Sequence, residues 1–327
     1  MPRKPYSYMV VDTETATLPF ANEIAKGNEE VKKKIAIAKP LIYDIGWMLA
    51  RRNGEISVRK QYLVAEIFSV PAVFNTAYYK DKRPIYLDML KKGEITLASW
   101  DAIMEDFIKD MEQADFVGAF NSMFDFKKAI PFTELYVRKL YSADYFDWER
   151  SQRRMCENIG GRKVSNEKVF DPNAFSFRGI EKPLFDIWGM SCEHLLNRKA
   201  YKDMCINNDM LTNSGEYFKT SAETAYRFMA DWYDFEEAHT ALADVEIETA
   251  LLLKMLRNHA ITIGIDYFPF RKLGYTDEYV LEASRPNEEH IRKVAEAMER
   301  YLAKANECSS YFVKISNKLC RLNEALT

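Results

Sequence analysis

The sequence predicts an α/β protein in which helices cover a central sheet, and three observations support this fold class. Short apolar runs, typical of strands, alternate along the chain with longer segments of helical periodicity. An Asn-Gly pair joins two of the strand-like runs, which is a strong signal for a β-hairpin. Strands and helices that follow one another in this order usually form one sheet with helices packed on it.

The first three strands are expected near the N-terminus. Residues 7–12 are apolar and end in Asp12, which indicates a short buried strand that finishes in a carboxylate. Residues 41–50 and 56–64 are strand-like runs on either side of the Asn53-Gly54 pair, and together they predict the hairpin. We expect the first strand to meet this hairpin in one sheet.

Helices and two further strands follow. Residues 97–113 carry apolar side chains at i, i+3, i+4 and i+7 spacing, which predicts an amphipathic helix. Residues 116–120 predict a fourth strand, and a helix is expected to begin near Ser122. A short strand or turn at 184–186 leads into another helix, and residues 240–258 form the clearest late helix.

The character of the chain changes after residue 265. From residue 284 onward, apolar residues repeat at helical spacing in two segments, and a proline lies near the start of the first. We therefore predict an α/β domain of residues 1–264 and a helical C-terminal extension of residues 265–327.

Composition and charge limit the classes of function. The chain has 327 residues, a formal net charge of −3 and five cysteines. No global positive field attracts nucleic acid, so a site for a polyanion has to be local, made by metal ions or clustered basic residues. The scattered cysteines predict a reduced protein rather than a disulfide scaffold. Because signal-peptide and membrane-spanning patterns are both lacking, we expect a cytoplasmic protein with no membrane partner.

Two acids end the first predicted strand. Asp12 and Glu14 are two residues apart, so their side chains point to the same side of a strand. Two like charges at that spacing are costly unless a cation holds them, and Mg²⁺ and Mn²⁺ prefer such oxygen ligands. The alternative is a pair of solvated acids at an exposed strand end.

Two further motifs place acids near helix starts. Asn121 and Asp125 follow the fourth strand at i, i+4 spacing and would share one face of a helical turn. His239 and Asp244 would lie about 140° apart if both were helical, so they could not converge on one site. His239 is therefore expected before the helix, with Asp244 in its first turns. The alternatives are helix caps and structural residues.

Together the three motifs resemble those of the DEDDh 3′→5′ exonuclease superfamily, the proofreading-exonuclease type with a ribonuclease H-like fold. The matching patterns are D-x-E, N-x-x-F-D and H-x-x-x-x-D, and the resemblance covers residues 12–264. Tyr43-Asp44-Ile45-Gly46 resembles the second strand of that family, which usually reads E-I-G. The resemblance implies a mixed central sheet of about five strands flanked by helices.

The resemblance also implies roles for the site residues. Asp12, Glu14 and Asp244 would hold one Mg²⁺ or Mn²⁺ ion. Asp12 would also hold a second ion, which Asp125 would bind directly or through water. His239 would be the general base for the attacking water, and the products would be nucleoside 5′-monophosphates. Two ions stabilise the attacking and leaving oxygens of a phosphoryl displacement. The residues expected to contact the substrate are Thr13, Thr15, Leu18 and Asn121.

The expected partner is a nucleic-acid 3′ end, single-stranded or frayed, with DNA favoured over RNA. The chain reads Ala16-Thr17-Leu18 where the family commonly has T-G-L, and Phe120 stands where many members have His. These departures leave the chemistry intact and the substrate preference open. Aromatic and basic residues between 136 and 177 are predicted to bind the strand, or else to be core and solvated surface.

Two alternatives remain. A 3′→5′ exoribonuclease would use the same mechanism, because the phosphates and metals are common to both polymers. A non-catalytic module could instead dock a polymerase or another replication protein through the helices after residue 286. The intact acids and histidine favour an enzyme.

Overall fold

The three longest strands come first in the chain and form consecutive antiparallel pairs. The computed structural model describes residues 6–18, 27–30, 40–138 and 173–284, together with 292, 293, 295 and 296. In it β1 (Ser7–Thr17) pairs antiparallel with β2 (Pro40–Arg51), and β2 pairs antiparallel with β3 (Ile56–Val64). The connection between β2 and β3 carries Gly54 at φ +90°, a conformation that favours glycine. The predicted hairpin is therefore confirmed.

The sheet has seven strands in the order β4-β3-β2-β1-β5-β7-β6. β5 (Phe116–Ala119) runs parallel to β1, and β7 (Ile180–Asp186) runs parallel to β5. The central strands β3-β2-β1-β5-β7 are thus the mixed sheet of about five strands that we expected. Two short strands extend its edges, β4 (Thr96–Ala98) beside β3 and β6 (Ala174–Phe177) beside β7. The α/β fold class is confirmed.

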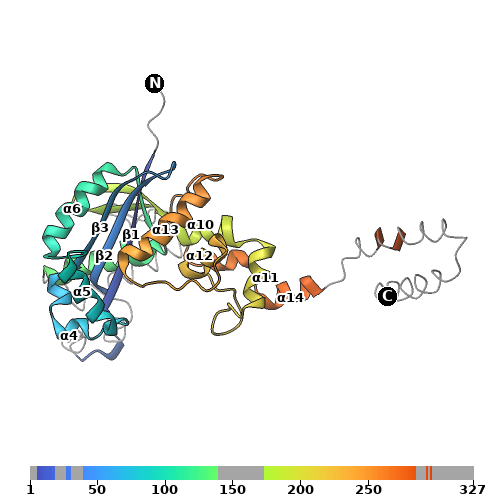
Figure 1. The fold of residues 1–327 in the computed structure, drawn as a ribbon, viewed down its shortest axis with the longest axis horizontal. Helices are drawn as coiled ribbons and strands as arrows, with labels where there is room; N and C mark the ends of the chain where they lie inside the picture. Colours follow the sequence, from blue (N-terminus) through green and yellow to red (C-terminus); the bar gives the residue numbers. More distant parts are fainter. Residues whose placement is uncertain are drawn as a thin grey trace, which may run out of the picture. The chain divides into compact units, whose positions relative to one another are not determined.

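Helices lie on both sides of the long strands (Figure 1). α13 (Ala241–Leu256) packs against β1 and β2, and α6 (Trp100–Gln113) packs against β3 and β1. Trp47 of β2 points towards α6, where its Nε1 donates to Asp110 at 2.9 Å. Its neighbour Gly46 faces α13 instead, as the alternation of strand side chains requires.

Shorter elements complete the described chain. They are α3 (Ala65–Phe68), α4 (Pro71–Phe74), η1 (Lys80–Lys82), α5 (Arg83–Lys92), α7 (Ser122–Phe124), η2 (Asp125–Ala129), α8 (Ile130–Val137), α10 (Ile187–Met190), η3 (Ser191–Leu196), α11 (Lys199–Asn207), α12 (Ala222–Ala230), η4 (Pro269–Leu273) and α14 (Thr276–Ser284).

Two sequence expectations are corrected. The helix expected from residue 97 begins at Trp100, because the side chain of Ser99 caps it and the residues before Ser99 pair with β3. Residues 174–177, for which no strand was predicted, form the edge strand β6. Residues 139–172, which hold most of the aromatic and basic segment, lie outside the described residues, as do nearly all residues after 284.

The chain divides into two compact units. The first comprises residues up to Leu211 and Phe218–Leu273, and the second comprises Thr212–Tyr217 and residues from Gly274 onward. Residues 265–273 group with the first unit, where Pro269 and Leu273 are buried. The division into residues 1–264 and 265–327 stays a prediction. No helix in the described part of the chain is long and apolar enough to cross a membrane.

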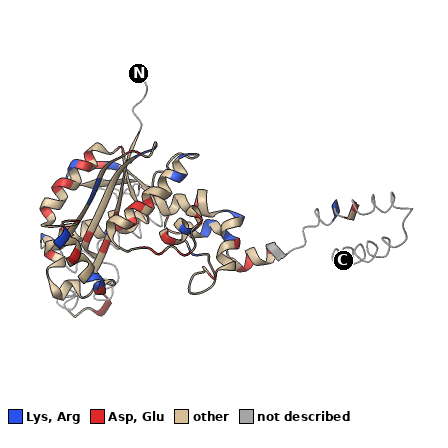
Figure 2. Ribbon diagram, viewed as in Figure 1, with Lys and Arg blue, Asp and Glu red and all other residues tan. Residues whose placement is uncertain are grey.

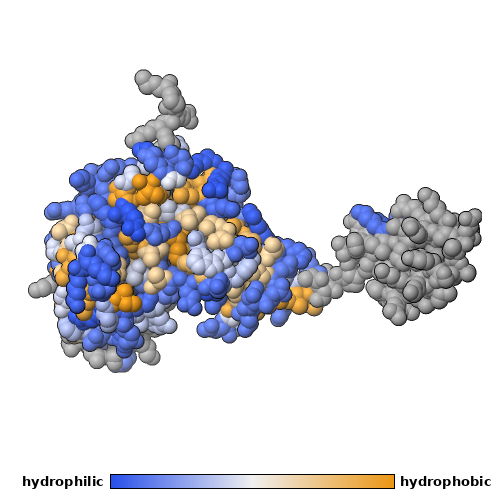
Figure 3. Space-filling model, viewed as in Figure 1, coloured by the Kyte–Doolittle hydropathy of each residue, from blue (hydrophilic) through white to orange (hydrophobic). Residues whose placement is uncertain are grey.

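The visible surface of the first unit carries both signs of charge. Acidic and basic residues alternate over its helices in Figure 2, and hydrophilic and apolar residues are interspersed in Figure 3. Neither view shows a broad basic patch on the described residues. This fits the expectation that a polyanion would have to be bound by a local site.

Candidate active site

Strand β1 presents Asp12 and Glu14 on the face covered by α13. Asp12 lies opposite Gly46 of β2, and Glu14 lies opposite Asp44. A Cβ atom on Gly46 would lie 2.7 Å from the backbone nitrogen of Leu242. Glycine at this position therefore lets the start of α13 approach the sheet beside the two acids.

Asp44 holds the first turn of α13 against β2. The side chain of Thr240, at the N-cap position, makes no capping hydrogen bond. Asp44 Oδ2 takes over this function and accepts from the backbone N–H of Ala241 at 3.0 Å. It also accepts from the hydroxyl of Tyr86 and the amide of Gln61, both at 2.9 Å. Burial raises the pKa of Asp44 to about 6, and these hydrogen bonds oppose that rise.

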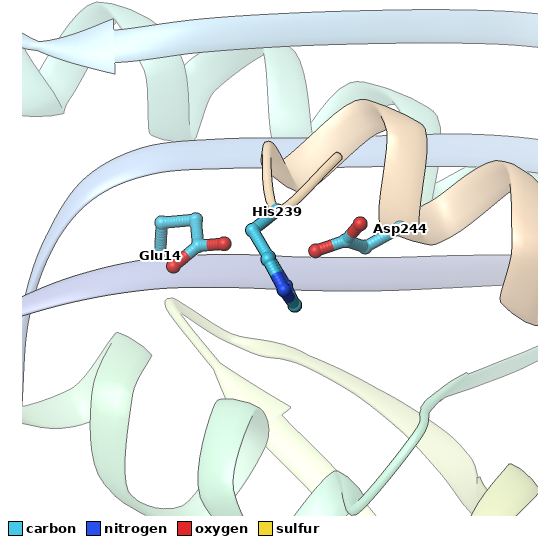
Figure 4. Close-up of side chains that lie close together, drawn as sticks. All are labelled: Glu14, His239 and Asp244. Atoms are coloured by element: carbon cyan, nitrogen blue, oxygen red, sulfur yellow. The ribbon is translucent and has the colours of Figure 1, made fainter. Parts of the chain in front are cut away.

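Three of the predicted site residues come together at this end of α13. One ligand atom each of Glu14, His239 and Asp244 lies within 4.8 Å of the other two, and Figure 4 shows the imidazole between the two carboxylates. As expected, His239 precedes the helix, with a left-handed φ of +50°, and Asp244 lies in the first turn. Asp244 Oδ1 is buried without a hydrogen-bond partner. Such an atom is costly unless a cation or a hydrogen-bond donor from solvent reaches it.

The acids of the site have raised pKa values. Burial, then the charges of Asp244 and Asp44, raise the pKa of Glu14 to about 9, and Lys82 opposes the rise. Burial, then the charge of Glu237, raise the pKa of Asp244 to about 8, again against Lys82. The protein thus supplies less positive charge than these carboxylates need, and a divalent cation would supply the rest.

Asp12 and Asp125 lie outside that close group. Burial, then the charges of Glu248 and Asp125, raise the pKa of Asp12 well above its usual range. Asp125 Oδ1 accepts from the hydroxyl of Thr13 at 2.6 Å, and burial raises the pKa of Asp125 to about 7. The side chain of Thr13 alternates to the opposite face of β1 from Glu14. Asp125 is therefore held beside β1 and still interacts with the charge of Asp12.

The residues expected to contact substrate differ in their surroundings. Thr13 is buried, and Thr15 is half-buried on β1. Leu18 is 3% exposed and packs in the core, so its role beside a terminal base stays a prediction. Asn121 has a left-handed φ of +70° and precedes α7, so it does not share a helix face with Asp125 as we expected. The chain turns there because the N–H of Ser122 donates to the buried Asp186 at 2.9 Å.

Glu248 is an acid of this site that sequence reasoning missed. It lies on α13 one turn after Asp244 and is 3% exposed. The N–H of Phe120 donates to Glu248 Oε2 at 3.1 Å. Burial, then the charge of Asp125, raise its pKa well above the usual range. The i, i+4 spacing from Asp244 places both acids on one helix face and was the available signal.

An aromatic side chain and a lysine hold the segment that carries His239. The rings of Tyr79 and His239 are stacked, with centroids 4.6 Å apart and an interplanar angle of 15°. Lys82 Nζ lies 4.6 Å from the centre of the Tyr79 ring and also donates to the carbonyl oxygen of Ala238. Glu237 Oε2 is 3.6 Å from His239 Nδ1. Burial, then the charge of Lys82, lower the pKa of His239, so its imidazole is neutral at pH 7.

Comparisons with known proteins include a structural resemblance to a nuclease. No protein-family model and no curated protein matches the sequence. Among solved structures, the chain is similar to cell-death related nuclease 4 (CRN-4), with 11% sequence identity and a TM-score of 0.32. The match covers 79% of this chain and 67% of that one. At this level of similarity the superposition identifies neither a substrate nor a catalytic residue.

Proposed function

We propose that the protein is a divalent-metal-dependent 3′→5′ exonuclease that releases nucleoside 5′-monophosphates from single-stranded or frayed DNA 3′ ends. The observation that carries this proposal is the convergence of Glu14, His239 and Asp244 within 4.8 Å, with Asp244 Oδ1 buried and unpaired. Carboxylates with too little nearby positive charge, beside a neutral imidazole, suit metal-assisted hydrolysis of a phosphodiester.

The donor atoms fit hard divalent cations. Carboxylate oxygens are the ligands that Mg²⁺ and Mn²⁺ prefer. We assign Glu14, Asp244 and Asp12 to one ion, and Asp12 and Asp125 to a second. When bound, such ions supply Lewis-acid polarisation of the phosphoryl oxygens and lower the pKa of water. Glu248, one turn after Asp244, adds negative charge behind these ligands.

His239 is assigned as the general base. Its lowered pKa keeps the imidazole neutral near pH 7, so that a ring nitrogen can accept the proton of the attacking water. Glu237 lies beside Nδ1, which leaves Nε2 as the atom for proton transfer. Tyr79 stacks on the ring and limits its rotation. The chain itself thus fixes the position of the base.

The choice of polymer and the direction of attack rest on the motif resemblance. An exoribonuclease would need the same acids and histidine, because the reacting phosphate is common to DNA and RNA. The 2′-hydroxyl is the group that separates them. A non-catalytic module, docked to a polymerase through the C-terminal segment, would have no need for unpaired acids beside a neutral histidine.

One experiment tests reaction type, polarity and metal dependence together. A 5′-labelled DNA oligonucleotide is incubated with the protein in Mg²⁺, Mn²⁺ or EDTA, beside a matched RNA. We expect a ladder of shortening labelled products in either metal, faster on DNA, and none in EDTA. Asp244→Asn serves as the inactive control because it removes charge without changing side-chain volume. A labelled mononucleotide as the first product would show 5′→3′ polarity, and an inert protein would favour the binding module.

A further inference from the structure

The ring of Tyr78 is presented to solvent beside the active site. It is 86% exposed, the largest value among the large apolar side chains of the described residues. Its ring meets that of Tyr79 edge to face, with centroids 4.8 Å apart. Tyr79 in turn stacks on His239 at 4.6 Å. Two ring contacts therefore separate Tyr78 from the residue assigned as general base.

Positive charge accompanies this ring on the same short segment. Lys80 and Lys82 follow Tyr78 in η1, and Lys82 contacts both the Tyr79 ring and the segment before His239. Lys82 is also the cation that opposes the rise in the pKa values of Glu14 and Asp244. On this side the acidic site is thus bordered by an exposed aromatic ring and amines. That pairing is what proteins use to stack unpaired bases and follow phosphates.

We propose that Tyr78 is a substrate-binding residue whose ring stacks on an unpaired nucleobase near the 3′ end of the strand being cut. This inference rests on the proposed function and names its substrate contact. A ring that is 86% exposed has at least one face open to a ligand. A base can offer its face only when it is unpaired and free of its neighbour, so the contact favours single-stranded or frayed ends. Stacking tolerates any base, which suits an enzyme that removes nucleotides in succession.

The test compares four proteins on two substrates. The proteins are wild type, Tyr78→Ala, Tyr78→Phe and the control Tyr6→Ala. Tyr6 is also exposed, at 56%, and packs against Phe116 beside the start of β1, at the opposite end of that strand from Glu14. The substrates are a single-stranded oligonucleotide and the same strand with abasic sites at its 3′-terminal positions.

On the normal strand, Tyr78→Ala should lower kcat/KM by roughly 5- to 150-fold, mainly through KM, as loss of one base stack predicts. Tyr78→Phe should retain nearly full activity, because it keeps the ring, and Tyr6→Ala should resemble wild type. On the abasic strand, wild type and Tyr78→Ala should become equal, since there is no base left to stack.

Two results would overturn the proposal. One is unchanged kcat/KM for Tyr78→Ala on the normal strand, which would leave Tyr78 as a contact for a protein partner or as plain surface. The other is an equal loss on normal and abasic strands, which would indicate a structural effect. Fluorescence anisotropy with both strands in EDTA measures binding without turnover. If the wild-type protein were inactive but still bound the normal strand more tightly than the abasic strand, and Tyr78→Ala removed that preference, the proposed nuclease activity would be refuted. The proposed stacking site would then still stand.

Discussion

Two groups of acids in the first unit have the same residue types, but their pKa values are shifted in opposite directions. In the first, Glu134 accepts from Arg178 Nη2 at 2.8 Å and from Trp100 Nε1 at 2.6 Å. Arg178 also pairs with Asp101 at 2.6 Å, and Arg138 joins the same network. Burial would raise the pKa of Glu134, but these hydrogen bonds prevail and lower it. We call these four charged residues the paired cluster.

The second group is the active-site acids, where charge compensation is incomplete. Burial, and then repulsion from neighbouring acids, raise the pKa values of Glu14, Asp125 and Asp244 to about 9, 7 and 8. Lys82 opposes the rise at Glu14 and Asp244 without cancelling it. We therefore expect the paired cluster to stabilise the fold, and the active-site acids to destabilise it in the absence of a bound cation.

The largest difference between the two groups should appear in activity. Asp12→Ala or Asp244→Asn should lower the rate of hydrolysis by on the order of a thousandfold or more, because the metals both position and activate. Metal-free stability should not fall in Asp244→Asn, since the variant removes a repelled charge. Initial rates and thermal unfolding in EDTA measure the two effects. Retained activity in either variant contradicts the metal assignment.

His239→Ala tests the neutral member of the site. Loss of a general base typically costs about 10²- to 10⁴-fold in rate. Oligonucleotide binding should be nearly unchanged, because the imidazole carries no charge at pH 7. Single-turnover rates and anisotropy titrations separate the two quantities. Near-normal turnover at neutral pH would move the base to another group.

The raised pKa values of the active-site acids predict how the stability of the protein depends on pH and on metal. A carboxyl whose folded pKa lies above its unfolded pKa binds its proton more tightly in the native state, so stability falls as pH rises between the two values. For Glu14 and Asp244 that window runs from about 4 to about 9. In EDTA the Tm should therefore decrease across this range.

Added Mg²⁺ or Mn²⁺ should restore stability, and more so at high pH, because the metal competes with protons for the same oxygens. At a hundred times the dissociation constant the gain is about 2.7 kcal/mol for one ion. Differential scanning fluorimetry at pH 5 and pH 8.5 measures it. A Tm that rises with pH in EDTA, or one that does not change when metal is added at pH 8.5, would contradict the assignment of raised pKa values and metal binding to the active-site acids.

The paired cluster should show the reverse behaviour. Glu134→Gln weakens charge-assisted hydrogen bonds to Arg178 and Arg138 and should cost about 1.5–3 kcal/mol of unfolding free energy. The rate of hydrolysis at a temperature where the variant is folded should stay at the wild-type level. Urea unfolding and the oligonucleotide assay check both statements. Asp88→Asn, which breaks an exposed pair with Lys92, is a control with little expected effect.

The smallest expected change concerns the uncharged packing at the active site. Tyr79→Ala removes the ring that stacks on His239 and should lower kcat by about 10- to 100-fold with little change in KM, because the base is misplaced. Tyr79→Phe keeps the stack and should remain close to wild type. A loss in Tyr79→Phe equal to that in Tyr79→Ala would assign the effect to the hydroxyl.

The fold class and the placement of His239 and Asp244 could be predicted from the sequence. Period-two and period-3.6 patterns locate the hairpin and α13, and the five-residue spacing already required His239 to precede the helix. Those features are local in the chain. The edge strand β6 was missed because its four residues alternate too briefly to stand out from an aromatic segment.

Other parts of the site depend on contacts between distant residues. Asp44 caps α13 from another element, and Lys82 and Tyr79 reach the segment of His239 from η1 and the residue before it. The residues next to each of these side chains in the sequence do not indicate which distant residue it will contact. Asn121 was placed on a helix face because i, i+4 spacing assumes helical backbone, whereas the bond from Ser122 to Asp186 turns the chain one residue earlier.

The origin of the active-site acids in separate elements has a kinetic consequence. Asp12 and Asp244 stand more than 200 residues apart in sequence and meet only when α13 docks on β1 and β2 beside Gly46. Contacts between such distant residues form late, after the long intervening chain has been closed. We therefore expect the repulsion among the acids to be largely absent from the folding transition state. It should then speed the unfolding of the metal-free protein and leave its folding rate nearly unchanged.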